Sequence, residues 1–167
     1  MKWMSEMKTY LGTKLVRMLP MNRLAYNQFR GWELPADKCG EDEGYLVEYL
    51  DGGKPNTPQY EGYVSWSPKE QADNAYRETS GMSFGLAVEA LKKGKLVARA
   101  GWNGKGMWLF IIQGSNDIAK LHGYGFGEME NEPTFRDAIF MKTVDNQLVP
   151  WTASQTDVLA DDWLIVE

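Results

Sequence analysis

The stretch "ARAGWNGKGMW", residues 98–108, restricts the fold more than any other part of this chain. Asn103-Gly104 stands between two apolar runs, and this dipeptide is the strongest short signal for a β-hairpin because a type I′ turn needs positive φ at both central positions. The pattern predicts antiparallel strands over 95–100 and 107–114, with Trp102 and Lys105 as a cross-strand pair beside the turn. The sheet that contains these residues must therefore have antiparallel neighbours.

The residues on both sides of this hairpin predict a module of helices and antiparallel strands. A helix is expected after Ser83 and ends at Gly94, with one apolar face formed by Phe84, Ala87, Val88 and Leu91. Two strands are expected within 138–151, around a turn at Asp145-Asn146. A helix over 152–163, with Thr152 and Gln155 as capping box, and a strand over 163–167 complete an α+β plan.

A first module, roughly residues 8–77, precedes this one. Strands are expected at 9–19, 44–50 and 62–67, and a short helix over 23–31 begins after Asn22. A second helix is expected to start with Ser67 as N-cap, Pro68 at the first helical position and Glu70 closing a capping box. The polar segment 79–82 is the expected join, which gives two modules of small, mainly antiparallel sheets with a few packed helices, at 1–78 and 82–167.

The composition narrows the range of partners. The chain has 18 basic and 23 acidic residues, and no Lys/Arg stripe appears, so we expect no nucleic acid polymer as partner. No apolar run reaches the roughly 20 residues of a membrane span, so we expect no membrane partner. No signal peptide is evident, and the single cysteine, Cys39, fits a reducing cytosol.

Motifs for catalysis are missing from the sequence. There is no GxSxG and no HExxH, and the one histidine, His122, leaves no base for a nucleophile. Asp161 and Asp162 are adjacent, so on a helix they point about 100° apart and we expect a solvated helix end. His122 and the acidic residues Glu128, Glu130 and Glu132 match no metal-ligand spacing. We therefore expect no enzyme, no metal and no cofactor.

Two segments carry the residue types of a binding site. In "GWNGKG", glycines allow close approach to the backbone, and an exposed indole, that of Trp102, is expected beside a lysine, where it offers a stacking face and a charge. In "VPWTASQTDVLADDW", polar residues crowd a helix start, which fits either plain capping or an anion site. The glycine- and aromatic-rich segment 122–132 fits either a solvated surface loop or a functional one.

Two longer blocks carry a resemblance. "MSFGLAVEALKKGKLVARAGWNGKGMWLFI" and "MKTVDNQLVPWTASQTDVLADDWLIV" closely resemble the second family of Thoeris anti-defense proteins, which phages and prophages encode. The family's members are compact α+β oligomers that bind, without cleaving it, the glycocyclic ADP-ribose signal made by a bacterial TIR-domain protein; some are associated with cyclic dinucleotides. The first module resembles a segment of uncharacterised phage proteins.

The resemblance implies a sponge for a cyclic nucleotide in the cytoplasm of an infected bacterium. It implies a homodimer or homotetramer, and a site that supplies aromatic faces for a base and polar donors for a pyrophosphate. The residues expected to bind are Phe84, Trp102, Asn103, Gly104, Lys105, Met107, Trp108, Trp151, Ala153, Ser154, Gln155, Thr156 and Asp157. The alternatives are a phage interaction module that grips a host protein and an enzyme that cleaves nucleotides.

Overall fold

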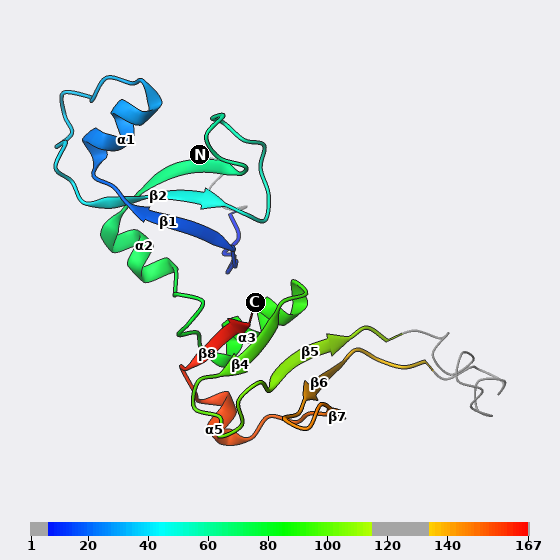
Figure 1. Cartoon of the computed structure of the whole chain (residues 1–167). Coiled ribbons are helices and arrows are strands. Elements are labelled where there is room, and N and C mark those ends of the chain that lie inside the picture. Colours follow the sequence, from blue (N-terminus) through cyan, green and yellow to red (C-terminus); the bar gives the residue numbers. More distant parts are fainter. Residues whose placement is uncertain (1–6, 115–133, 167) are drawn as a thin grey trace. The chain divides into compact units, whose positions relative to one another are not determined.

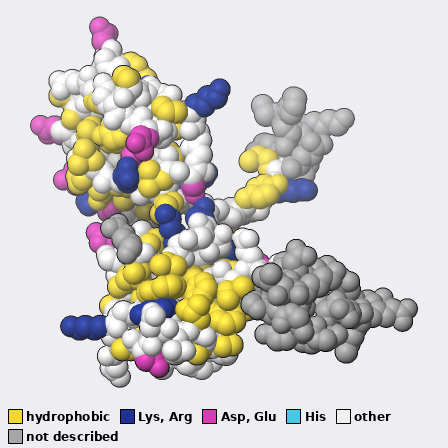
Figure 2. Space-filling model, turned by 45° about the vertical axis from the view of Figure 1, so that its right-hand side comes forward, with side chains coloured by type: hydrophobic (Ala, Val, Ile, Leu, Met, Phe, Trp, Pro, Cys, Tyr) yellow, Lys and Arg dark blue, Asp and Glu magenta, His cyan; other side chains and the backbone are white. Residues whose placement is uncertain are grey.

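The computed structural model describes residues 7–114 and 134–166, and the chain forms two compact units, Met1–Tyr76 and Arg77–Glu167 (Figure 1). Within the described ranges there are four helices and two antiparallel sheets, which confirms the predicted α+β class. On the face that Figure 2 shows, Lys and Arg side chains are scattered rather than gathered in a stripe. Among the described residues, no helix combines the length and the apolar character that a membrane span requires.

The first unit is a three-stranded sheet with two helices packed on it. Its elements are β1 (Val16–Pro20), α1 (Arg23–Arg30), β2 (Gly44–Tyr49), β3 (Tyr63–Pro68) and α2 (Lys69–Ala75). The strand order is β1-β2-β3 and both pairings are antiparallel. Tyr26 of α1 packs with Leu46 and Val64, and this buried group forms the core of the unit.

Local signals explain where α1 begins and ends. The side-chain oxygen of Asn22 accepts a hydrogen bond from the backbone N–H of Ala25 at 2.8 Å, and Gly31, with φ of 67°, ends the helix. These observations confirm the predicted helix and its cap. The first strand is shorter than predicted, because β1 begins only at Val16.

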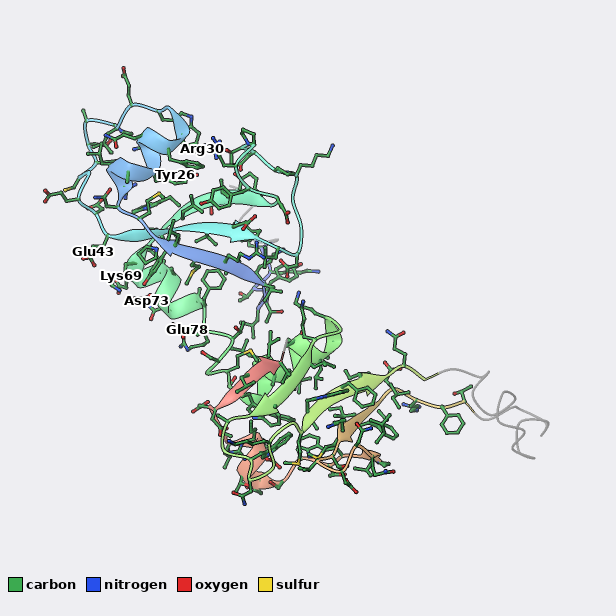
Figure 3. All side chains as sticks on the ribbon, viewed as in Figure 1. Tyr26, Arg30, Glu43, Lys69, Asp73 and Glu78 are labelled. Atoms are coloured by element: carbon green, nitrogen blue, oxygen red, sulfur yellow. The ribbon has the colours of Figure 1, made fainter. Side chains whose placement is uncertain are left out.

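The capping box predicted for the second helix is wrong. Ser67 lies in β3, which runs on to Pro68, so α2 begins at Lys69 and has no side-chain cap. Ser67 and Pro68 pair with β2 as part of β3, so they are not available as the N-cap and the first helical residue. Lys69 and Asp73, one turn apart on α2, form an exposed ion pair at 3.2 Å (Figure 3).

The second unit is a five-stranded antiparallel sheet in the order β7-β6-β5-β4-β8. Its elements are α3 (Phe84–Lys92), β4 (Leu96–Arg99), β5 (Trp108–Ile112), β6 (Ala138–Lys142), β7 (Leu148–Pro150), α5 (Gln155–Val158) and β8 (Trp163–Val166). Helix α3 packs on β4, β5 and β8 and buries Ala87, Ala90 and Leu91 against Val97 and Leu109. Residues 79–82 run beside β8, where Met82 and Trp163 exchange two backbone hydrogen bonds.

Two predicted turns have different outcomes. The turn at Asp145-Asn146 is confirmed, since Asn146 has a φ of 66°. The type I′ turn at Asn103-Gly104 is wrong, because neither residue has positive φ. Strand β4 ends at Arg99 and β5 begins at Trp108, so the connection is longer than a two-residue turn. The Val97–Leu109 pair also sets a register in which Trp102 and Lys105 are not a cross-strand pair.

The helix predicted over 152–163 is also wrong in extent and in its cap. Helix α5 covers only Gln155–Val158, with Ser154 as N-cap and Asp157, instead of Thr152 and Gln155, completing the capping box. In this capping box the backbone N–H groups of Ser154 and Asp157 already donate hydrogen bonds to each other's side chains, so they are not available to an anion. This supports the interpretation of the segment as a helix cap rather than as an anion site.

Glycine at position 44 should be essential to the packing of the first unit. A Cβ atom there would lie 2.4 Å from the Trp66 ring and 2.5 Å from the backbone oxygen of Ser67. We expect Gly44→Ala to lower the free energy of unfolding by about 1–3 kcal/mol, measured by urea denaturation with tryptophan fluorescence. Gly12→Ala, with no atom near the added methyl group, is the control and should change it little. Equal stability of the two variants would contradict this packing.

Candidate functional site

Four aromatic rings meet in the second unit. Trp163 is fully buried, and the rings of Phe84, Trp102 and Trp151 surround it at centroid distances of 5.4, 5.5 and 6.0 Å. These three outer rings are half-buried, so each keeps part of its surface open to solvent. We call Phe84, Trp102, Trp151 and Trp163 the aromatic cluster. It offers apolar ring surface on a rigid support.

Different elements position the members of the aromatic cluster. Phe84 is the first residue of α3, and Trp151 directly follows β7, where its backbone N–H donates to Ile139 at 3.0 Å. Trp163 begins β8, and its indole N–H donates to the backbone oxygen of Asp157 at 3.0 Å. Trp102 lies in the connection between β4 and β5. The cluster therefore forms only when the whole unit is folded.

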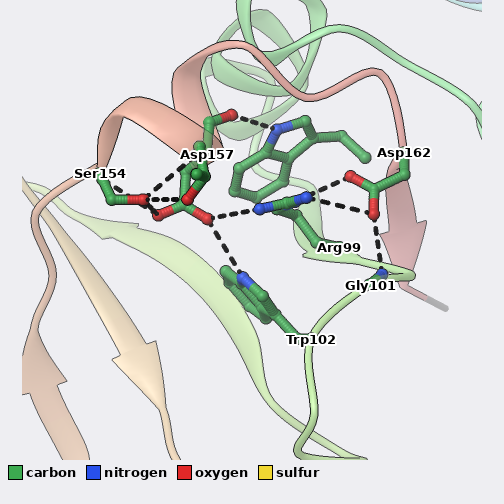
Figure 4. A network of polar contacts seen from close by, with 8 residues as sticks. Arg99, Gly101, Trp102, Ser154, Asp157 and Asp162 are labelled. Carbon is green, nitrogen blue, oxygen red and sulfur yellow. Dashed lines mark hydrogen bonds and ion pairs between the residues drawn. The ribbon is translucent and has the colours of Figure 1, made fainter.

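A polar network centred on Arg99 holds the edge of the cluster (Figure 4). The Nε of Arg99 donates to Asp162 at 2.7 Å, and its Nη1 donates to Asp157 at 2.9 Å. Asp162 also accepts from the backbone N–H of Gly101 at 2.8 Å. The indole N–H of Trp102 donates to the same oxygen of Asp157 that binds Arg99, at 3.3 Å. The network thus fixes both the backbone and the ring of the Trp102 segment.

The carboxylate of Asp157 is fully used by this network. One oxygen accepts from Arg99 and Trp102, and the other accepts from the backbone N–H and the hydroxyl of Ser154. Burial alone would raise the pKa of Asp157, but the hydrogen bonds from Ser154 and Arg99 outweigh it and lower the pKa to about 2. Hydrogen bonding from Arg99 also lowers the pKa of Asp162. Both groups are therefore ionised at neutral pH.

The structure brings together only part of the predicted binding set. Phe84, Trp102 and Trp151 share the aromatic cluster, and Ser154 and Asp157 adjoin it through the network. Trp108 does not join them, because it lies beside Phe110, on the sheet face opposite the core residue Leu109. The remaining predicted residues are exposed or half-buried: Asn103, Gly104, Lys105, Met107, Ala153, Gln155 and Thr156.

Three expectations about side chains in this region need correction. Trp102 is not a freely exposed indole, since it packs on Trp163 and is hydrogen-bonded. Asp157 has no free lone pair to offer a ligand, because four donors occupy its carboxylate, so we assign it a positioning role. Asp162 does not lie at a solvated helix end; it pairs with Arg99.

Residue-by-residue reasoning missed the roles of Arg99 and Asp162. One signal was available: an arginine that ends the apolar strand "KLVAR" needs an acidic partner if it is to be half-buried. Its partners are 58 and 63 residues away, so the sequence could not identify them.

Metal binding has no support in ranges 7–114 and 134–166, where no group of three His, Cys, Asp or Glu side chains could hold an ion. His122, Glu128, Glu130 and Glu132, and the segment 122–132 that contains them, lie outside the described residues.

Comparison with known proteins matches the second unit. Residues 82–166 match the family model of the Thoeris anti-defense 2-like domain. A curated relative, Thoeris anti-defense 2 of Bacillus phage SP01, is 56% identical over 85 residues, which are 51% of this chain and 94% of the relative. The aromatic cluster and the Arg99 network lie entirely within the matched residues. The first unit lies outside them.

The lowered pKa of Asp157 predicts a loss of stability in acid. A carboxyl group with a pKa of about 2 in the folded chain and 3.8 as its ordinary value stabilises the fold above pH 4 and loses that contribution as the pH falls toward 2. We expect the stability advantage of the wild type over Asp157→Asn, measured by urea denaturation, to shrink by about 2 kcal/mol between pH 5 and pH 2. Asp161→Asn, at an exposed neighbour, is the control and should track the wild type. A constant difference between wild type and Asp157→Asn would contradict the network.

Proposed function

The chain belongs to the Thoeris anti-defense 2-like family through residues 82–166, and on that premise we propose that it is a phage anti-defense protein that sequesters a cyclic nucleotide immune signal. The proposed ligand is of the glycocyclic ADP-ribose type, with cyclic dinucleotides as a related class. The proposed site of action is the cytoplasm of the infected bacterium.

The observation that carries this proposal is the aromatic cluster. Phe84, Trp102 and Trp151 expose ring surface around the buried Trp163, and an adenine base can stack on such surface. Stacking one base contributes about 1–3 kcal/mol, whereas a nanomolar dissociation constant corresponds to about −12 kcal/mol. The rest must come from polar contacts and from enclosure by further walls. Asn103 and Lys105, exposed beside Trp102, are suited to the ribose and phosphate groups.

Binding without cleavage is supported by the state of the acidic groups. Asp157 and Asp162 are ionised and paired with Arg99, so neither carries a proton to donate to a leaving group. Asp157 is also fully hydrogen-bonded, which leaves it unable to activate a water molecule. These pairs serve to hold the Trp102 segment in place.

Self-association is supported by the second face of the five-stranded sheet. Leu109 and Ile111 face the core, so Trp108 and Phe110 of the same strand point to the other face, where Phe110 stacks with Phe140 at 6.1 Å. Leu148 lies on that face as well, because it pairs with Lys142, the partner of Trp108. A sheet with two apolar faces needs a second layer, and another copy of the chain can provide it. We therefore propose a homodimer or homotetramer in which neighbouring copies complete the ligand site.

A capture experiment tests the proposed function. The purified chain is mixed with glycocyclic ADP-ribose, filtered and heated, and the ligand is followed by mass spectrometry. We expect free ligand to disappear and to return intact on heating. Trp102→Ala should weaken binding by about 1–3 kcal/mol and also lower the melting temperature, because Trp102 packs on Trp163. Tyr10→Ala, which removes an exposed ring of the first unit, is the control.

Other results of the capture experiment separate the alternatives. Recovery of a modified nucleotide would mean an enzyme. If the free ligand is not depleted, the proposal that the chain sequesters this ligand is contradicted. The remaining alternative is then a module that binds a host protein.

The self-association proposal has its own test. Leu148 is 57% exposed on the proposed interface, so Leu148→Glu should leave the fold intact and shift the mass measured by light scattering toward the monomer. Leu11→Glu, at a fully exposed residue of the first unit, adds the same charge and should leave the mass unchanged. A wild type that is monomeric and still binds the ligand tightly would contradict the shared site.

A further inference from the structure

The first unit contains an open cavity of about 590 Å³ that the comparisons do not cover. Helix α1, the residue Asn56 and strand β3 form its walls. Figure 3 shows Tyr26 and Arg30 on α1, and Arg30 reaches the connection between β2 and β3, where it donates to the backbone oxygen of Asn56 at 3.3 Å. The volume lies within the range of about 300–1,000 Å³ that is usual for small-molecule sites.

Two arginines give the cavity a positive charge. Arg23 and Arg30 are seven residues apart, so they lie on one face of α1. Each guanidinium lies over an indole, Arg23 at 4.2 Å from the ring centre of Trp66 and Arg30 at 4.5 Å from that of Trp32. A stacked guanidinium keeps its N–H edge available for a phosphate or carboxylate.

Only one of the two charges is neutralised within the described ranges. Arg23 forms an ion pair with Asp42 at 2.9 Å. Arg30 contacts the neutral oxygens of Tyr26, at 3.5 Å, and Asn56, and no ion pair joins it to an acidic residue of the described chain. Burial raises the pKa of Tyr26, so its hydroxyl stays protonated and does not supply the missing negative charge.

An amide without a protein partner points to a polar ligand rather than to an anion alone. Asn27 lines the cavity, and its side chain forms no hydrogen bond with any described residue. The residue is only 8% exposed, but its amide atoms remain accessible to solvent. The amide therefore has its donor and its acceptor free for a ligand that enters the cavity. The amide presents a donor next to an acceptor, which matches the edge of a nucleobase.

Ring surface is available in the same cavity. Trp32 is 54% exposed and Tyr63 is 43% exposed. Trp66 is fixed as part of the wall, because its indole N–H donates to Met21 at 2.8 Å and the absence of a side chain at Gly44 leaves room for the ring.

We propose that this cavity of the first unit binds a mononucleotide, with Arg30 holding the phosphate, Asn27 reading the edge of the base and Trp32 or Tyr63 stacking on its face. A free phosphate would use Arg30 alone and leave Asn27 unpaired. An acidic peptide would use the arginines but has no flat ring for Tyr63. The proposal concerns the first unit and does not depend on the function proposed for the second.

The test measures binding of nucleotides to the full-length chain by calorimetry. The probes are AMP, GMP, CMP and UMP, with adenosine, inorganic phosphate and hexaglutamate for comparison. We expect at least one mononucleotide to bind more tightly than all three comparison probes. Arg30→Ala should weaken that binding at least tenfold, and Lys38→Ala, which removes an exposed charge of the same unit outside the cavity, should not.

A second variant guards against misfolding. Tyr63→Leu keeps apolar bulk in β3 and removes only the ring, so it should weaken nucleotide binding about fivefold or more. Both cavity variants are checked by circular dichroism. Three results would each overturn the proposal. In the first, no mononucleotide binds saturably at concentrations up to about 1 mM. In the second, phosphate or hexaglutamate binds as tightly as the nucleotides, and in the third a folded Arg30→Ala variant keeps full affinity. Capture of glycocyclic ADP-ribose by Arg30→Ala shows separately whether the second unit still functions.

Discussion

The double ion pair of Arg99 holds the second unit together around its aromatic cluster. One guanidinium on β4 binds Asp157 of α5 and Asp162, which directly precedes β8, so it fixes both ends of the short segment that leads to the buried Trp163. Because the side chains of Arg99 and Asp157 are largely withdrawn from water, removing either one would leave an uncompensated charge, which costs more than breaking a surface pair. The same carboxylates bind the backbone of Gly101 and the indole of Trp102. Stability and the shape of the proposed site therefore depend on one set of contacts.

The two units differ in the polar and charged groups that they offer to a ligand. The second unit holds the residues that match the family, and its Asp157 and Asp162 are both paired with Arg99, which fits the proposed binding without cleavage. The first unit has its own core around Tyr26, Leu46 and Val64 and its own cavity. In that cavity Arg30 contacts only neutral oxygens, and the amide of Asn27 has no partner among the described residues. That contrast supports our proposal that each unit binds a ligand of its own.

Local sequence signals were sufficient to predict the structure wherever it depends on residues that are close together in the chain. The Asn22 cap, the helix after Ser83 and the turn at Asp145-Asn146 all form as predicted. The turn at Asn103-Gly104 does not, because Asp162, 61 residues from Gly101, draws the backbone into a wider connection. Likewise Ser154 with Asp157 replaces Thr152 with Gln155 as the cap, since Arg99 and Trp102 hold Asp157 in place. Trp108 was predicted for the site because it is close to Trp102 in the sequence, but the alternation of side chains along β5 places it on the opposite face of the sheet. Phe84 and Trp151, which are 67 residues apart in the chain, lie with Trp102 in the aromatic cluster.

The most direct test of the proposed sponge site follows the indole N–H signals of the chain by nuclear magnetic resonance during titration with glycocyclic ADP-ribose. Each of the seven tryptophans has one indole N–H, and its signal is assigned by substituting that residue. We expect the signals of Trp102 and Trp151, whose rings are partly open, to shift most within the aromatic cluster, and that of the buried Trp163 to shift less. Saturation of the chain with ligand while the Trp102 and Trp151 signals stay in place would contradict a binding site built on the aromatic cluster.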